Sequence, residues 1–284
     1  MANGNFTQVT EFILTGVSVR PDLQIPLFFV FLVIYGLTVT GNLSIITLTN
    51  VDSHLQTPMY FFLQHLAIIN LGNSTVIAPK MLINFLVKKH TTSYYERATQ
   101  LGGFLVFIVA EVLLLVVMAY DRYVAICNPL LYMVVVSQMI CLPLVSLTYL
   151  YSFCTSIVTL FSVFSMAYCS FNVINHFYCD IVPFLALSCS DTSFPETVVF
   201  ISVSTNLMFS ITVVVASYCN IILPILRIHS SEGRKRDFSA CVSHMTAVSV
   251  FYGTLFFMYL QPRNNHSLET DQMASVFHTL VIPC

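Results

Sequence analysis

Charged side chains inside long apolar runs are the residues of this sequence best placed to do chemistry. Glu111 stands alone within such a run, and Asp121 and Arg122 are adjacent near the end of the same run. An ionisable group within a membrane span is costly and usually has a function. An acid and a base cost less when buried as a pair, so Asp121 and Arg122 could also be an interfacial salt bridge that anchors a helix.

Enzymatic, metal and nucleic-acid chemistry have little support in the residue pattern. The histidines and serines are scattered, with no spacing that would assemble a nucleophile or a metal centre. His176 and Cys179 are three positions apart, but two ligands are too few for a metal site. We therefore expect no enzyme activity, no cofactor and no bound metal. The net charge of −2 gives no electrostatic case for a nucleic-acid partner.

The elements that position the charged residues must be helices that cross a membrane. Hydrophobic residues make up 57% of the 284 residues and charged residues only 8%, whereas soluble domains carry about 25% charged residues. A spanning helix needs about 20 mostly apolar residues. Six segments meet that length, at about residues 25–50, 58–87, 99–126, 139–167, 197–228 and 238–261.

A seventh apolar segment covers residues 272–284. At a rise of about 1.5 Å per residue it gives a helix of about 20 Å, which is short of a full crossing. The sequence therefore predicts an all-α membrane protein. Its expected architecture is a seven-transmembrane helix bundle over residues 25–284, with a truncated seventh helix and an N-terminal segment of residues 1–24.

The orientation of the bundle follows from its outer segments, because basic residues divide almost equally between the two sides. The sequon Asn5-Phe6-Thr7 falls on the same side as a polar segment that holds Cys169, Cys179 and Cys189. Glycosylation and clustered cysteines both belong to the outer face of a cell. We therefore expect an extracellular N-terminus that is glycosylated at Asn5.

Short motifs recur in order along nearly the whole chain. The most specific is Met118-Ala119-Tyr120-Asp121-Arg122-Tyr123, which continues through Cys127. The others are Gly41-Asn42, Pro58–Leu63, Pro79–Leu82, Ser217-Tyr218, Phe238–His244 and Phe251-Tyr252-Gly253. In these motifs the chain resembles the odorant (olfactory) receptor family of the rhodopsin-like (class A) G-protein-coupled receptors.

The resemblance implies a multi-pass receptor of the plasma membrane that binds a small odorant and activates a heterotrimeric G protein of the olfactory, stimulatory type. It assigns activation and G-protein coupling to Asp121, Arg122, Tyr123, Tyr218 and Tyr252, with Asp121 holding Arg122 while the receptor is inactive. Tyr218 and Tyr252 could instead be amphipathic fillers with satisfied hydroxyls. The basic cluster Arg234–Arg236 could bind acidic membrane lipid or the G protein, or only set the topology.

The resemblance also places the odorant pocket in the outer half of the bundle. The matching positions are Phe104, Leu105, Ile108, Val109, Ser202, Val203, Asn206, Leu255, Phe256 and Tyr259. A mostly apolar cavity with a few polar groups suits a small volatile ligand. The face carries no acidic residue, which argues against a cationic amine.

Three positions depart from the family pattern. Asn70 stands where the family has an aspartate that holds sodium with the glutamate matching Glu111, so we expect weak sodium binding, or a protonated Glu111 hydrogen-bonded to Asn70. Arg97 stands where the family has a cysteine, which leaves Cys179 unpaired, while Cys169 and Cys189 can still form a disulfide. The family also continues beyond Cys284 with an Asn-Pro…Tyr motif and an amphipathic helix.

Two interpretations of function therefore stay open. The first is an odorant receptor that signals through a G protein. The second is a truncated, non-signalling remnant that stays in the endoplasmic reticulum or acts only as an interaction partner of full receptors. A transporter or channel is less favoured, because the sequence shows no internal repeat and Glu111 stands nearly alone as an ionisable group in the middle of a membrane span.

Overall fold

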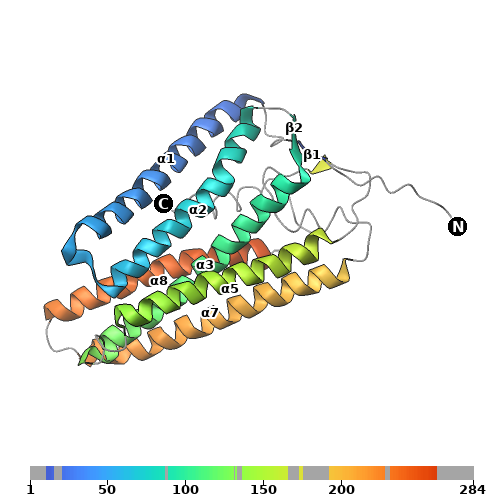
Figure 1. Cartoon of the computed structure of the whole chain (residues 1–284). Coiled ribbons are helices and arrows are strands. Elements are labelled where there is room, and N and C mark those ends of the chain that lie inside the picture. The colour runs from blue at the N-terminus through green and yellow to red at the C-terminus, as the bar shows by residue number, and fades with distance from the viewer. Residues whose placement is uncertain are drawn as a thin grey trace.

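The structure is a computed structural model that describes residues 11–15, 21–86, 89–130, 132, 136–165, 173–174, 192–227 and 231–260. Within these ranges, six long helices lie alongside one another in a bundle (Figure 1). They are α1 (Pro21–Val51), α2 (Pro58–Leu86), α3 (Tyr94–Cys127), α5 (Gln138–Phe164), α7 (Ser193–Arg227) and α8 (Ser231–Leu260). A 3-10 turn, η1 (Ser53–Leu55), connects α1 to α2.

Several features expected from the sequence lie outside the described residues. These are the sequon at Asn5, the outer cysteines Cys169, Cys179 and Cys189, and the seventh apolar segment at 272–284. Arg97, Arg234–Arg236 and Tyr259 belong to described helices, but their side chains are outside the described part of the structure.

Several helices begin earlier than hydropathy predicts. Helix α3 begins at Tyr94 rather than 99, α7 at Ser193 rather than 197, and α8 at Ser231 rather than 238. The additional residues include polar and charged side chains, which hydropathy does not assign to a membrane span. A helix can nevertheless continue past the hydrocarbon layer into water. Hydropathy marks only the part of a helix that lies in the apolar layer.

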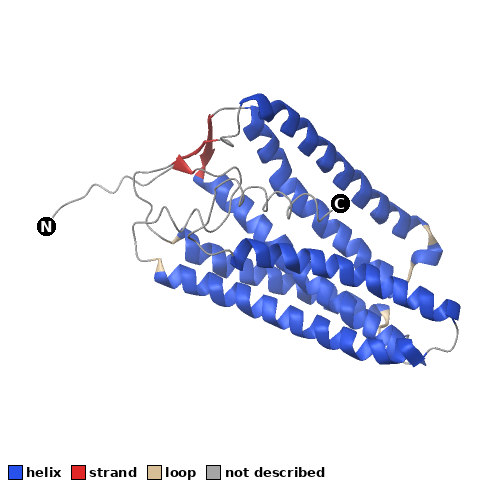
Figure 2. Ribbon diagram, turned by 180° about the vertical axis from the view of Figure 1, so that it is seen from behind, coloured by secondary structure: helices blue, strands red, loops and turns tan. Residues whose placement is uncertain are grey.

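A small sheet accompanies the expected helical bundle. Strand β1 (Glu11–Thr15) pairs antiparallel with β2 (Lys89–Ser93) and parallel with β3 (Val173–Ile174), which gives the order β2-β1-β3. The sheet lies at one end of the bundle (Figure 2). Its strands come from distant parts of the chain, so no local pattern in the sequence signals their pairing.

Helix α5 shows that the bundle is built for a lipid environment. Its buried face carries the hydroxyl residues Thr148, Ser152, Ser156, Thr159 and Ser162. Its exposed face carries large apolar side chains, among them Leu147, Leu150, Phe153 and Phe161. Polar groups inside and apolar groups outside reverse the pattern of a water-soluble helix, and they match a helix that faces hydrocarbon.

Length and composition support membrane crossing along most of the described chain. Five described helices have spans apolar enough to cross, at 25–51, 58–83, 98–127, 139–164 and 193–222. In α8 the apolar stretch is shorter and covers Cys241–Phe256. The chain is therefore a multi-pass helical membrane protein.

Helix α3 runs through the middle of the bundle and packs against α2, α5, α7 and α8. Two glycines permit its close approach to neighbouring helices. A Cβ atom added to Gly72 of α2 would lie 2.3 Å from Cζ of Phe107, and one added to Gly102 would lie 2.6 Å from Cδ1 of Leu160 in α5. Side chains at these positions would overlap with the packing partner.

We expect the substitution Gly72→Ala to destabilise the bundle relative to Gly36→Ala, which has nothing within 4 Å of the added atom. Both changes gain about 1 kcal/mol of helix propensity. Only Gly72→Ala must displace the Phe107 ring, at a cost of about 1–3 kcal/mol. Thermal melting of the purified protein in detergent checks this order, and equal melting temperatures would contradict the packing.

Candidate functional site

A cavity lies among α3, α5 and α7, with one lining residue from α8. Its volume is about 90 Å³. The lining residues are Phe104, Leu105, Ile108, Val109, Val112, Thr155, Ser156, Thr159, Val199, Ser202, Val203, Asn206, Leu207 and Leu255. The wall is mostly apolar with a few hydroxyl and amide groups, which is the composition of a site for a small organic molecule.

The structure brings together eight of the ten residues that the sequence assigned to a pocket. Phe104, Leu105, Ile108 and Val109 of α3, Ser202, Val203 and Asn206 of α7, and Leu255 of α8 all line the cavity. Phe256 instead packs against the apolar cluster between α3, α7 and α8. The side chain of Tyr259 is outside the described part of the structure.

Sequence reasoning missed the wall that α5 contributes. Thr155, Ser156 and Thr159 line the cavity, and Ser156 and Thr159 are buried. The signal was present, because Ser152, Ser156 and Thr159 follow one another at four and three positions and so share one helix face. Without the tertiary structure, that face could have pointed at any neighbouring helix.

A larger cavity, of about 470 Å³, lies between the ends of α1, α2 and α5 near η1. His65 lines it and makes a 3.3 Å hydrogen bond between its Nδ1 and the hydroxyl of Tyr149. Ile68 and Leu142, which also line it, are 40% and 60% exposed. This space therefore opens toward the lipid-facing surface, and the cavity between α3, α5 and α7 is the better candidate for a specific ligand.

The acid of the Asp-Arg pair has an unexpected partner. The hydroxyl of Tyr132, which follows α3, donates a 3.0 Å hydrogen bond to Oδ1 of Asp121. Burial, and then the negative charge of Asp121, raise the pKa of the Tyr132 phenol, so the hydroxyl keeps its proton. Among the described residues no ion pair joins Arg122 to Asp121, although the charge of Arg122 still acts on the Asp121 carboxyl.

The charge of Arg122 acts on groups all around this part of the bundle. It interacts with Asp121 and Tyr132, and also with Tyr218 of α7 and His244 of α8. The Tyr218 hydroxyl forms a hydrogen bond with Nδ1 of His244, and the two rings stack. No local pattern in the sequence signals this pair, because the two residues lie on different helices.

The buried carboxyl of α3 lies apart from these contacts. Glu111 is buried, and the structure shows no hydrogen bond between Glu111 and Asn70. Asn70 Oδ1, Asn73 Oδ1 and Ser74 Oγ of α2 are buried without a hydrogen-bond partner. The expected Glu111–Asn70 hydrogen bond is therefore absent from the described structure. These unpaired oxygens are the kind of ligand that binds a hard cation such as Na⁺. Weak sodium binding therefore remains a prediction.

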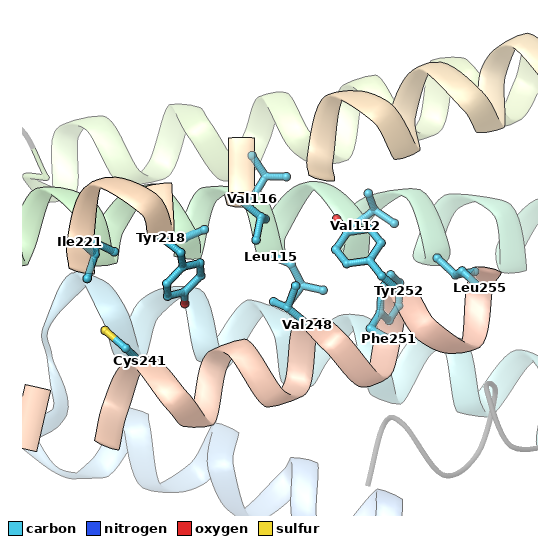
Figure 3. Packing of buried hydrophobic residues seen from close by; sticks show 12 residues of the cluster. Val112, Leu115, Val116, Tyr218, Ile221, Cys241, Val248, Phe251, Tyr252 and Leu255 are labelled. Atoms are coloured by element: carbon cyan, nitrogen blue, oxygen red, sulfur yellow. The ribbon is translucent and has the colours of Figure 1, made fainter. Parts of the chain in front are cut away.

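An apolar cluster connects the cavity to the Tyr218–His244 pair. Figure 3 shows side chains of α3, α7 and α8 that pack together along the bundle. Val112 and Leu255 belong to this cluster and also line the cavity. Tyr218 and Tyr252 are buried in it, and Tyr123 packs against it. The two parts of the site are thus joined by continuous contact.

We expect Tyr218→Phe to destabilise the protein, because Nδ1 of His244 would lose its partner in a region where Nε2 already has none. An unsatisfied buried group costs about 1–3 kcal/mol. Thermal melting in detergent measures the loss, with Tyr120→Phe as control because Tyr120 is 44% exposed. If the two variants melt at the same temperature, the Tyr218–His244 hydrogen bond contributes nothing to stability.

Comparison with known proteins places the chain in a family. The family model described as "Olfactory receptor" matches residues 31–283. The human proteins Olfactory receptor 8J3 and Olfactory receptor 8J1 are each 75% identical to the chain, over 100% of its length and 90% of theirs. Squid rhodopsin superposes with a TM-score of 0.72 at 16% identity, covering 93% of this chain and 76% of that one, and so shares its fold. The chain therefore belongs to the olfactory receptor family of G-protein-coupled receptors.

Proposed function

We propose that the cavity between α3, α5 and α7 binds a small, volatile odorant. Its wall is formed mostly by apolar side chains, and the polar groups come from α5 and α7. Among the lining residues none is charged, so a neutral ligand is favoured over an ion. Family membership supports the same ligand class.

The apolar cluster that joins the cavity to Tyr218 supports a route for activation. Val112 and Leu255 touch the cavity and the apolar cluster at once, and the same cluster contains Tyr218. A ligand that shifts these side chains changes the packing of α7 and α8 around Tyr218 and His244, on which the charge of Arg122 acts. The position of Val112 and Leu255 in both the cavity wall and the apolar cluster is the main support for this function.

The partner and the location complete the proposal. The G protein is a heterotrimer of the stimulatory, olfactory type, so odorant binding raises cyclic AMP. The receptor lies in the plasma membrane with an extracellular N-terminus, which puts the cavity toward the outer side and Arg122 toward the cytoplasm. The roles of Asp121, Arg122, Tyr123, Tyr218 and Tyr252 in coupling belong to the same proposal.

Filling the cavity is the direct test. We expect Val109→Phe to raise the odorant concentration for half-maximal cyclic AMP by at least about tenfold, because the added ring occupies part of the ligand volume. Val158→Phe is the matched control, since Val158 is 56% exposed on α5 and does not line the cavity. Cells expressing each variant at equal surface density are compared. Equal loss in both variants would contradict this ligand site.

The hydrogen bond from Tyr132 to Asp121 generates a separate prediction. We expect Tyr132→Phe to lower the maximal cyclic AMP response about fivefold, because Asp121 would then turn to Arg122 and hold it away from Tyr218. One hydrogen bond of about 1 kcal/mol shifts a two-state population by about that factor. The response at saturating odorant is normalised to surface expression, with Tyr151→Phe as the exposed control. An unchanged or larger response would refute this role.

A further inference from the structure

The hydroxyl groups on the α5 wall of the cavity already donate their protons in hydrogen bonds within the helix. Thr155 donates to the backbone carbonyl of Tyr151, Ser156 donates to that of Ser152 at 2.7 Å, and Thr159 donates to that of Thr155 at 3.0 Å. Such bonds to the preceding turn are the usual way for a Ser or Thr in a helix to satisfy its proton where no water is present. The α5 wall therefore presents oxygen lone pairs to the cavity.

The α7 wall still has hydrogen-bond donors as well as acceptors available to a ligand. Asn206 Nδ2 donates to the backbone carbonyl of Ser202 at 2.8 Å, and this bond uses one of the two amide protons. The amide keeps one N–H and its oxygen available. Ser202, which carries a hydroxyl, also lines the cavity. The α7 wall can thus both donate and accept, whereas the α5 wall can only accept.

We propose that the cavity selects neutral ligands whose polar group donates a hydrogen bond, namely alcohols and phenols, over carbonyl compounds and ethers of the same skeleton. This inference rests on the proposed function of the cavity and specifies its ligand class. A ligand hydroxyl gives its proton to an oxygen of the α5 wall and accepts from the α7 wall. It can therefore hydrogen-bond to both walls at once.

A carbonyl oxygen meets a less favourable wall. Against α5 it would face oxygen atoms whose protons are directed into the helix backbone. To obtain a hydrogen bond there, it would first have to break one of the bonds from Ser156 or Thr159 to the preceding turn. Its remaining option is the α7 wall, so it forms at most the bonds that an alcohol also forms. Basic amines are disfavoured separately, because no lining residue carries a negative charge.

The test compares matched probes on cells that express the receptor with a surface tag. The probes are cyclohexanol, cyclohexanone and methoxycyclohexane, and 1-hexanol with hexanal and 1-methoxyhexane. We expect each alcohol to act at a concentration about fivefold to tenfold lower than its carbonyl and ether counterparts, the effect of one net hydrogen bond. The readout is the concentration for half-maximal cyclic AMP.

Variants locate the effect. Thr159→Val keeps the shape of the side chain and removes its oxygen, so we expect it to weaken the alcohols and leave the ethers unchanged. Ser156→Ala should act in the same direction. Thr148→Val is the matched control, because Thr148 is equally buried on α5 and bonds to the carbonyl of Leu144 at 2.9 Å but does not line the cavity. It should leave the alcohol preference intact.

The outcomes separate the two proposals. Carbonyl compounds that act as well as alcohols overturn the ligand-class inference and leave odorant binding in the cavity standing. The inference also fails if Thr159→Val and Thr148→Val change the alcohol preference equally. The ligand-class inference also fails if the receptor reaches the cell surface but responds to none of the probes. If the same cells then respond to other neutral volatiles, and Val109→Phe abolishes that response, odorant binding in the cavity still stands.

Discussion

Polar groups in the hydrocarbon layer must find partners within the protein, because no water can satisfy them there. Side-chain hydroxyls along the helices meet this requirement by donating to the carbonyl of the preceding turn, as Thr38 does to Ile34 and Ser152 does to Thr148. These bonds keep each helix self-sufficient in hydrogen bonds. They also allow hydroxyl residues to face the interior, where their oxygens become available to a neighbouring helix or to a ligand.

Helix α3 carries the functional geometry because it contacts both ends of the proposed route. In and just beyond its N-terminal half it supplies five lining residues of the cavity, up to Val112, and near its C-terminal end it holds Asp121 and Arg122. Its close packing on α2 and α5 depends on Gly72 and Gly102, where an added Cβ atom would require Phe107 or Leu160 to move. A central helix fixed in this way is a reference against which α7 and α8 can shift when the cavity is occupied.

The contacts near the C-terminal end of α3 depend on tertiary packing as well as on local charge. Asp121 and Arg122 are neighbours in the sequence, yet no ion pair joins them in the described part of the structure. Asp121 accepts its hydrogen bond from Tyr132, while the charge of Arg122 acts on Asp121 and also on Tyr218 and His244. Adjacent residues on a helix point about 100° apart, so nearness in sequence does not make them a salt bridge.

The sequence by itself determined the membrane helices and most of the cavity lining, because long apolar runs and ordered motifs are local patterns. Phe104 and Ile108, four positions apart, share a helix face whatever that face meets. Only the tertiary structure decided which faces meet. It brought the hydroxyls of α5 to the cavity, paired Tyr218 with His244, and joined β1 to strands far along the chain. Such contacts depend on how helices rotate and pack against one another, and no single segment of the chain carries that information.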